Sequence, residues 1–269
     1  MQIAIRQFRT HAEYKACVAL QQETWGAVFT EMVPPSILLV SQKIGGVAAG
    51  AFDEHDRLIG FVFGLTGVKN GRLVHWSDML AVRPEARDLG IGKRLKLYQR
   101  ELVQALGVET IYWTYDPLVA RNAHLNLNRL GVEVEEYVPD MYDSDSQSDL
   151  HRGLALDRFV VAWHISSDKP SKETEDTSAK ARERFKDAGI INPHGQCATL
   201  SENSAFVHAR MRIEIPPDIQ AVKESSLETA MQWQASVRQA CLFYLDHGYR
   251  VAGFYRDPEN GRCFYGVEK

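Results

Sequence analysis

The feature that most constrains the fold of this chain is a strand, a glycine-rich turn and a helix in direct succession. Leu73 to Val82 is a predicted strand, and Gly90 and Gly92 follow it. Apolar side chains then recur at three- and four-residue steps, at Ile91, Leu95, Tyr98, Leu102 and Ala105. Gly107 stands where the C-terminal cap of this helix is expected. A strand that leads into an amphipathic helix predicts layered α/β structure.

The same reading predicts the other elements of the first 165 residues. A strand near Ile3 to Phe8 precedes a helix with Tyr14, Cys17, Val18 and Leu20 or Gln21 near one face. The remaining predicted elements are strands at 47–52, 58–65, 110–115, 132–138 and 157–164, and a helix at 118–130. The order β-α-β-β-β-α-β-α-β-β predicts an α/β (α+β) domain over residues 1–165, with a mixed central sheet flanked by helices.

Residues 166–204 form a predicted polar linker with a short helix, because the stretch from Ser166 to Asp176 is too polar to fold alone. Residues 205–269 then form a predicted small α+β unit. Its first strand alternates apolar and polar residues from Val207 to Ile215. A capping box, Ser225-x-x-Glu228, begins a helix that ends at Gly248, and strands at 251–255 and 263–267 form a hairpin.

Bulk properties favour a small-molecule ligand. A net charge of -4 over 269 residues provides no field for a polyanion, so no nucleic-acid partner is expected. The cysteines, Cys17, Cys197, Cys241 and Cys263, lack metal-site spacing, and no metal site is predicted. The N-terminus lacks the apolar segment of a signal peptide, and no run reaches the roughly 18 apolar residues of a membrane span. We therefore expect a cytoplasmic protein without a membrane partner.

The glycine-rich turn has the composition of an anion site. Gly90 and Gly92 allow backbone NH groups to approach a ligand, and the helix dipole adds positive potential there. Arg87 can bind phosphate oxygens through two nitrogens. Further positive charge is expected from Lys93, Arg94 and Lys96. The turn is thus suited to a ligand that carries phosphates.

Two nucleotide motifs do not fit this turn. In register with Gly92 and Lys93, a P-loop requires glycine where Arg87 stands and a hydroxyl residue where Arg94 stands. A Rossmann fingerprint requires a third glycine at Leu95. The segment from Leu80 to Leu95, LAVRPEARDLGIGKRL, instead resembles the central motif of the GNAT superfamily of acyl-CoA N-acyltransferases, R/Q-x-x-G-x-G/A after a strand that ends in Val-x-Pro.

The resemblance implies an acyl-CoA co-substrate, acetyl-CoA or another acyl-CoA. The strand ending at Val82 would splay from the strand beginning at Thr110, and the pantetheine arm would bond to backbone groups of Leu80 and Val82 in that gap. The pyrophosphate would meet the NH groups of Leu89 to Lys93. The implied binding residues are Leu80, Ala81, Val82, Arg87, Asp88, Leu89, Gly90, Ile91, Gly92 and Lys93.

The resemblance also implies N-acyl transfer, which requires a neutral amine and a protonated leaving thiolate. Asp78 shares the face of Leu80 if the strand is regular, so it is the first choice as base; His75 is the alternative, because a bulge would exchange the two faces. Many relatives use a helical Tyr as acid, but Leu127 stands in its place. Tyr115 is the nearest substitute, with His124 and Asn126 as further candidates.

The implied reaction moves an acetyl or larger acyl group, such as succinyl, to a primary amine of an amino acid or related small metabolite. Arg158 or Arg121 could bind the carboxylate of such an acceptor. The acidic connection 140–149 is a solvated loop or attracts a cationic amine. The alternative is a non-catalytic CoA-binding module whose C-terminal unit holds a partner through Phe206, Val207, Trp233 and Phe243, residues that otherwise form a small core. A homodimer is possible for either.

Overall fold

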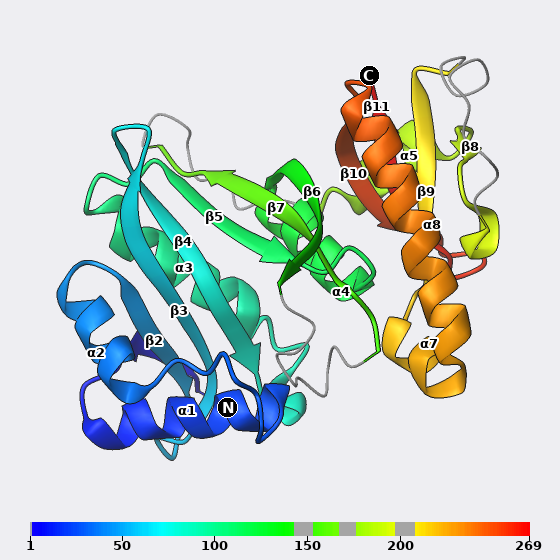
Figure 1. The fold of residues 1–269 in the computed structure, drawn as a ribbon. Coiled ribbons are helices and arrows are strands. Elements are labelled where there is room, and N and C mark those ends of the chain that lie inside the picture. Colours follow the sequence, from blue (N-terminus) through cyan, green and yellow to red (C-terminus); the bar gives the residue numbers. More distant parts are fainter. Residues whose placement is uncertain (1, 143–152, 167–175, 197–207) are drawn as a thin grey trace. The chain divides into compact units, whose positions relative to one another are not determined.

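The computed structural model describes residues 2–142, 153–166, 176–196 and 208–269, which form two compact units (Figure 1). Of these residues, unit 1 holds 2–113 and 162–166, and unit 2 holds 114–142, 153–161, 176–196 and 208–269. The sequence prediction placed its boundaries at 165 and 205 instead. The acidic connection after Tyr142, Cys197, Phe206, Val207 and the parts 167–175 and 197–204 of the predicted linker lie outside the described residues.

A seven-stranded sheet has the order β1-β2-β3-β4-β5-β7-β6. The first four strands pair antiparallel in sequence order, and β4 pairs parallel with β5. Its strands are β1 (Ala4–Gln7), β2 (Val47–Phe52), β3 (Leu58–Lys69), β4 (Arg72–Val82), β5 (Thr110–Tyr115), β6 (Glu133–Tyr142) and β7 (Leu156–His164). The predicted mixed sheet is therefore confirmed.

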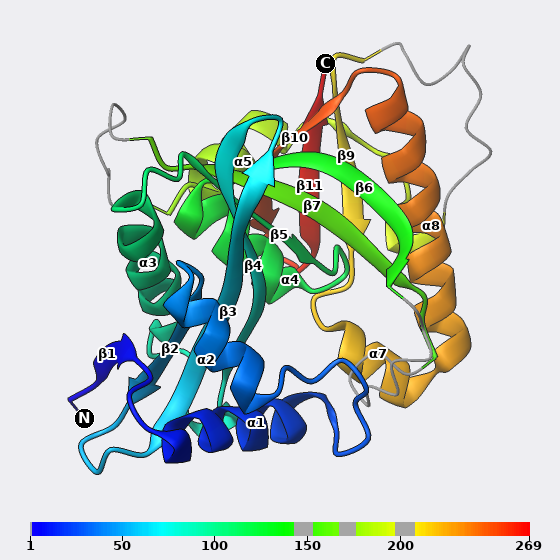
Figure 2. The same cartoon turned by 60° about the vertical axis from the view of Figure 1, so that its left-hand side comes forward.

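Three helices pack on the first strands of this sheet: α1 (His11–Trp25), α2 (Pro35–Lys43) and α3 (Ile91–Gln104). In Figure 1, α1 and α2 lie in front of β3 and β4 and α3 lies behind them; in the turned view of Figure 2, α3 stands to the left of these strands. The sequence prediction missed α2. Pro34 and Pro35 are adjacent there, and proline at the first helical position starts a helix because its missing NH needs no partner.

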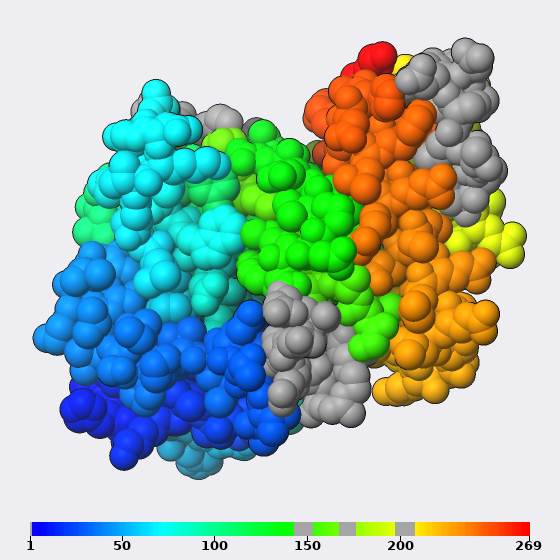
Figure 3. Space-filling view, in the orientation of Figure 1, coloured from blue at the N-terminus to red at the C-terminus, as the bar shows by residue number. Residues whose placement is uncertain are grey.

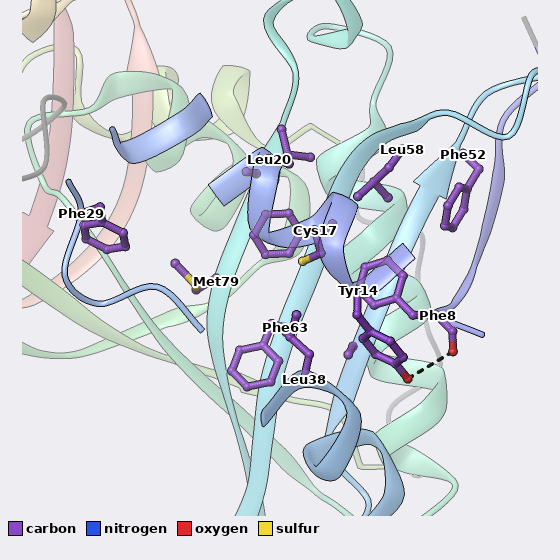
Figure 4. Close-up of a cluster of buried hydrophobic side chains, with 13 residues drawn as sticks. Phe8, Tyr14, Cys17, Leu20, Phe29, Leu38, Phe52, Leu58, Phe63 and Met79 are labelled. Atoms are coloured by element: carbon purple, nitrogen blue, oxygen red, sulfur yellow. Dashed lines mark hydrogen bonds between the residues drawn. The ribbon is translucent and has the colours of Figure 1, made fainter. Parts of the chain in front are cut away.

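The core of unit 1 lies between the sheet and the pair α1 and α2 (Figure 4). Phe8, Tyr14 and Phe52 meet edge to face, and the Tyr14 hydroxyl donates to the Phe8 carbonyl at 3.5 Å. Met79 of β4 belongs to the same cluster. The tip of the β3–β4 hairpin reaches the molecular surface, in cyan in Figure 3.

The predicted helix 118–130 exists in an altered form. An α-helical turn, α4 (Ala120–Ala123), continues as a π-helix, η2 (His124–Leu130), which ends at Gly131 with a φ of 67°. The wider π turn displaces side chains from α-helical spacing, and such turns occur often at functional sites. Leu127, at the position of the missing tyrosine, is buried.

The C-terminal part of unit 2 forms a four-stranded sheet of order β10-β11-β9-β8. Its strands are β8 (Gly189–Ile190), β9 (Arg210–Ile215), β10 (Arg250–Arg256) and β11 (Cys263–Glu268), and its helices are α5 (Ser178–Phe185), α7 (Ile219–Ser225) and α8 (Leu227–Asp246). The predicted α+β unit is confirmed. Within the predicted linker, α5 is the expected short helix, but β8 joins the second sheet.

The predicted capping box is wrong by one residue. Ser226 is the N-cap of α8, and its hydroxyl accepts a hydrogen bond from the NH of Thr229 at 3.1 Å. Ser225 is the last residue of α7, a helix that the sequence reading also missed. Because α7 ends at Ser225 and Ser226 caps α8, the predicted capping box began at the last residue of α7 instead of at the N-cap of α8.

Candidate functional site

The turn between β4 and α3 presents unsatisfied backbone donors. After β4 ends at Val82, a 3-10 turn, η1 (Pro84–Ala86), leads to Gly90, which has a φ of 70°. No side chain caps α3, and nothing lies within 4 Å of a Cβ built on Gly90. Within the described residues, the NH groups of Ile91, Gly92 and Lys93 donate to no protein acceptor. Such free NH groups, together with the helix dipole, are suited to hold an anion.

Asp88 precedes these donors and is itself in the left-handed region, with a φ of 65°. It is exposed, as are Arg87 and Leu89. The left-handed region is disfavoured for any residue with a Cβ, although aspartate tolerates it better than most. The turn therefore combines local strain with a negative charge beside the donors.

The cations predicted for this anion site are only partly available to it. The guanidinium of exposed Arg87 reaches the Val82 carbonyl at 3.4 Å, next to the turn. Arg94 instead donates to the Ile3 carbonyl at 2.8 Å. Lys96 is 4% exposed, and its amine donates to the Ser77 hydroxyl at 2.7 Å. The prediction that Lys96 supplies positive charge to the turn is wrong, because its side chain enters the interior.

The strands β4 and β5 pair only at their beginnings, from Val74 with Thr110 to Trp76 with Tyr112. We call the unpaired continuation of β4, residues 77–82, together with Trp113 after the last paired residue of β5, the fork. The Arg83 NH donates to the Ile59 carbonyl of β3, and hydrogen-bonded positions alternate along an antiparallel pair. The backbone groups of Leu80 and Val82 therefore point away from β3, toward the fork.

A β-bulge interrupts β4 within the fork. Met79 pairs with Phe63 and Ser77 pairs with Gly64, so Asp78 is an extra residue without its own partner in β3. Side chains an even number of residues apart therefore point to opposite faces of the sheet across the bulge. His75 lies against α3, whereas Met79 packs among the residues of α1 and α2. The regular strand assumed when Asp78 was assigned to the face of Leu80 is not observed.

Asp78 is accessible to solvent, yet surrounding protein groups raise the pKa of its carboxyl. Desolvation is the largest cause, and the negative charge of Glu31 adds to it. Glu31 lies between α1 and α2 in an irregular segment, and nothing in the local sequence pattern marked it. An accessible carboxyl whose pKa is raised toward neutrality suits a general base.

His75 is fully buried, and both ring nitrogens have partners. Nδ1 lies 2.9 Å from the Thr66 hydroxyl, and Nε2 lies 2.9 Å from the Gln99 amide. Burial, with a smaller contribution from the charge of Lys96, lowers the pKa of His75 to about 3. The ring therefore stays neutral at physiological pH in the interior of unit 1.

The other predicted site residues lie in unit 2. Tyr115 is buried, and burial raises the pKa of its hydroxyl. His124 contacts Asn128 at 3.1 Å, and Asn126 is buried. Arg158 is buried 4.0 Å from Asp116, whereas Arg121 is exposed. Tyr115 thus lies in the interior of unit 2.

Within the described residues, no group of three or more His, Cys, Asp or Glu residues could hold a metal ion. Within the same residues, every helix is too short or too polar to cross a lipid bilayer.

No family model matches the sequence, and no curated protein matches it. Solved structures do resemble the fold. A GNAT-family acetyltransferase from Streptococcus pneumoniae is 16% identical, with a TM-score of 0.48 over 61% of this chain and 100% of its own. A GNAT-superfamily phosphinothricin acetyltransferase from Sinorhizobium meliloti, in complex with acetyl-CoA, is 19% identical, with a TM-score of 0.48 over 65% of this chain and 96% of its own. Likeness at this level says nothing about the activity of this chain. The geometry of β4, the turn and α3 is considered for that question instead.

Proposed function

We propose that the chain is an acyl-CoA-dependent N-acyltransferase whose acyl-CoA site lies within residues 1–165. One observation carries the proposal: unsatisfied NH groups at the start of α3 follow directly on a strand whose end is unpaired on one side. The first feature suits a pyrophosphate, and the second suits an extended amide-containing arm. Acyl-CoA contains both, in that order.

In the proposed complex, the pyrophosphate accepts hydrogen bonds from Ile91, Gly92 and Lys93, with Arg87 beside it. The amides of pantetheine bond to the backbone of Leu80 and Val82, which faces the fork. This recognition uses backbone groups, so it needs few particular side chains. Ala81, Asp88, Leu89 and Gly90 shape the turn and the strand around the ligand.

Asp78 acts as the base of the proposed reaction. The acceptor ammonium loses a proton to this carboxylate, which passes it to solvent. The neutral nitrogen then attacks the thioester carbonyl, the carboxylate takes the second nitrogen proton, and the C–S bond breaks to release the thiolate. Glu31 and Asp78 together favour a cationic amine near the bulge. Their charges support a primary amine as the acceptor. We propose that this amine belongs to an amino acid or a related small metabolite, and that the transferred group is acetyl or a larger acyl group such as succinyl.

His75 and Tyr115 are less suited to catalysis than the sequence suggested. Both are buried, and His75 uses both nitrogens in hydrogen bonds. We propose structural functions for them, with Asp78 as the single base.

Two measurements test the proposal. Calorimetry is expected to show CoA binding that is lost in Gly92→Glu, because the added carboxylate repels the pyrophosphate. Gln22→Glu adds the same charge on an exposed position of α1 and is expected to bind normally. Release of CoA thiol from acetyl-CoA and succinyl-CoA is then followed over a panel of amines, amino acids and peptides. Unchanged CoA affinity in Gly92→Glu would contradict the assigned site.

The alternative is a CoA-binding module without catalysis, which Leu127 in place of the usual tyrosine favours. Of its proposed partner-binding residues, Trp233 lies against Gly195, and Phe243 packs on Tyr244 and His247. Both side chains thus contribute to packing within unit 2. Tight CoA binding without turnover over the whole panel would select this alternative.

A further inference from the structure

Lys96 occupies the closed end of the fork. Its amine donates to the Ser77 hydroxyl at 2.7 Å and lies 3.7 Å from the centre of the Trp113 ring. Ser77 and Trp113 directly follow Trp76 and Tyr112, the last paired residues of β4 and β5. One amine therefore contacts both strands at the first position where they are no longer paired.

The surroundings of this amine do not compensate its charge. In the described part of the chain no carboxylate pairs with Lys96, and the charged or titratable groups near it are His75 of β4 and Arg100, one helical turn later in α3. β5 and β7 contribute the rings of Trp113 and Trp163. Burial lowers the pKa of Lys96 well below its usual range. A buried amine without an acidic partner destabilises a fold, so its presence suggests a function.

Ser77 is oriented to pass a proton onward. Because the amine donates to its oxygen, the hydroxyl proton of Ser77 is free to point elsewhere, and no acceptor for it is found among the described residues. Ser77 is five residues before Val82, a span of roughly 16 Å at the usual rise of a strand. An extended pantetheine arm whose pyrophosphate lies at the turn covers a span of this order, so its sulfur would arrive near Ser77.

Resting on the proposed acyl transfer, we propose that Ser77 donates the proton to the leaving thiolate of CoA and that Lys96 positions Ser77 and replaces its proton. When the C–S bond breaks, the electron pair stays on sulfur, sulfur takes the hydroxyl proton of Ser77, and Ser77 takes a proton from the Lys96 ammonium. Neutral Lys96 regains a proton from solvent after product release. This relay supplies the acid that Leu127 lacks.

The chemistry of the amine fits this function. An unperturbed lysine, with a pKa of about 10.4, is a weaker acid than a thiol of about 8.5. Desolvation makes the Lys96 ammonium a stronger acid than an unperturbed lysine, which favours proton transfer toward the leaving sulfur.

Lys96→Met tests the inference because methionine fills a similar volume without the amine. We expect CoA affinity within twofold of the wild type, kcat lower by about 100-fold or more, and a melting temperature higher by about 2–4 °C. Ser77→Ala is expected to lower kcat similarly without changing CoA affinity. Gln99→Met, on the same buried face of α3, is the matched control and is expected to keep kcat within threefold.

The pH profile separates a proton relay from a structural contact. Wild-type kcat is expected to fall with rising pH as Lys96 loses its proton, at a pH below the usual range of lysine, and this fall is expected to be absent in Lys96→Met. His75 titrates at about 3 and Arg100 remains charged, so neither produces that change.

Three outcomes would overturn the inference. If Lys96→Met keeps the wild-type kcat and its fall with rising pH, the relay is excluded and the proposed function is unaffected. Lys96→Met that loses stability and kcat together makes Lys96 a structural residue. A wild-type protein that binds no CoA removes both the relay and the proposed function.

Discussion

At the scale of single residues, Asp88 is a strained residue beside the NH groups that are proposed to bind CoA. Asp88→Gly removes the disfavoured φ of 65° and a negative charge at the start of α3. We expect stability to rise by up to about 1 kcal/mol and CoA to bind several-fold more tightly. Chemical denaturation and calorimetry measure the two effects.

Asp56→Gly is the matched control for Asp88, since Asp56 has a φ of 58° in the β2–β3 turn. It is expected to change stability without changing CoA affinity. Equal CoA affinity in wild type and Asp88→Gly would show that Asp88 does not face the ligand.

Asp78 links activity to pH at the same scale. A base must be ionised, so kcat/KM is expected to rise with pH through the raised pKa of Asp78. Asp78→Asn is expected to lower kcat/KM at neutral pH and to lose less at high pH, where free amine is abundant. A variant with the wild-type profile would exclude Asp78 as the base.

The raised pKa of Asp78 also has a consequence for folding. A carboxyl that binds its proton more tightly when folded loses stability as pH rises from its unfolded pKa through its folded pKa. Asp78→Asn is therefore expected to be more stable than the wild type at neutral pH and to show no such gain in acid below the unfolded pKa. Denaturant midpoints at the two pH values measure this difference.

At the scale of elements, the start of α8 depends on one hydroxyl. Ser226→Ala removes the hydrogen bond to the Thr229 NH and is expected to cost about 1 kcal/mol of stability. Ser225 is instead the last residue of α7, so Ser225→Ala is expected to leave the free energy of unfolding nearly unchanged. Urea denaturation of the two variants compares them directly. A larger loss of stability in Ser225→Ala than in Ser226→Ala would show that the predicted capping box, which begins at Ser225, is correct.

At the scale of the whole molecule, the C-terminal helices and strands complete unit 2. Asp157 of β7 is 3% exposed, and it accepts hydrogen bonds from Tyr137 of β6 at 2.5 Å and from Arg238 of α8 at 2.8 Å. The Tyr265 hydroxyl of β11 donates to the Pro117 carbonyl at 2.8 Å. The last strands of the large sheet thus share their polar contacts and their core with the C-terminal residues.

These contacts predict the behaviour of residues 1–165 expressed alone. Such a chain lacks Arg238 and Tyr265, so the buried carboxylate of Asp157 loses its ion pair and Phe159 loses a packed ring. Removing one partner of a buried pair costs about 3–5 kcal/mol. We expect residues 1–165 to unfold without a cooperative thermal transition by circular dichroism. A stable fold of this fragment would show that the predicted boundary at 165 is correct.

The sequence by itself determined the seven strands of the first sheet in their order along the chain, the turn at Gly90, and the absence of a tyrosine at Leu127. These features depend on periodicity and on glycine conformation, which neighbouring residues specify locally. Residues 35–43 escaped this reading because their helix is short and begins at a proline.

Only the tertiary structure decided where the side chains of β4 and α3 point. The bulge at Asp78 follows from the register between β3 and β4, which adjacent residues do not encode. Lys96, Gln99 and Val103 share a helix face by spacing, yet a lysine in a basic segment is expected to reach solvent. Packing of α3 against the sheet instead enclosed the Lys96 amine at the fork, because the helix axis is fixed by its many apolar contacts and one charged side chain does not reorient it.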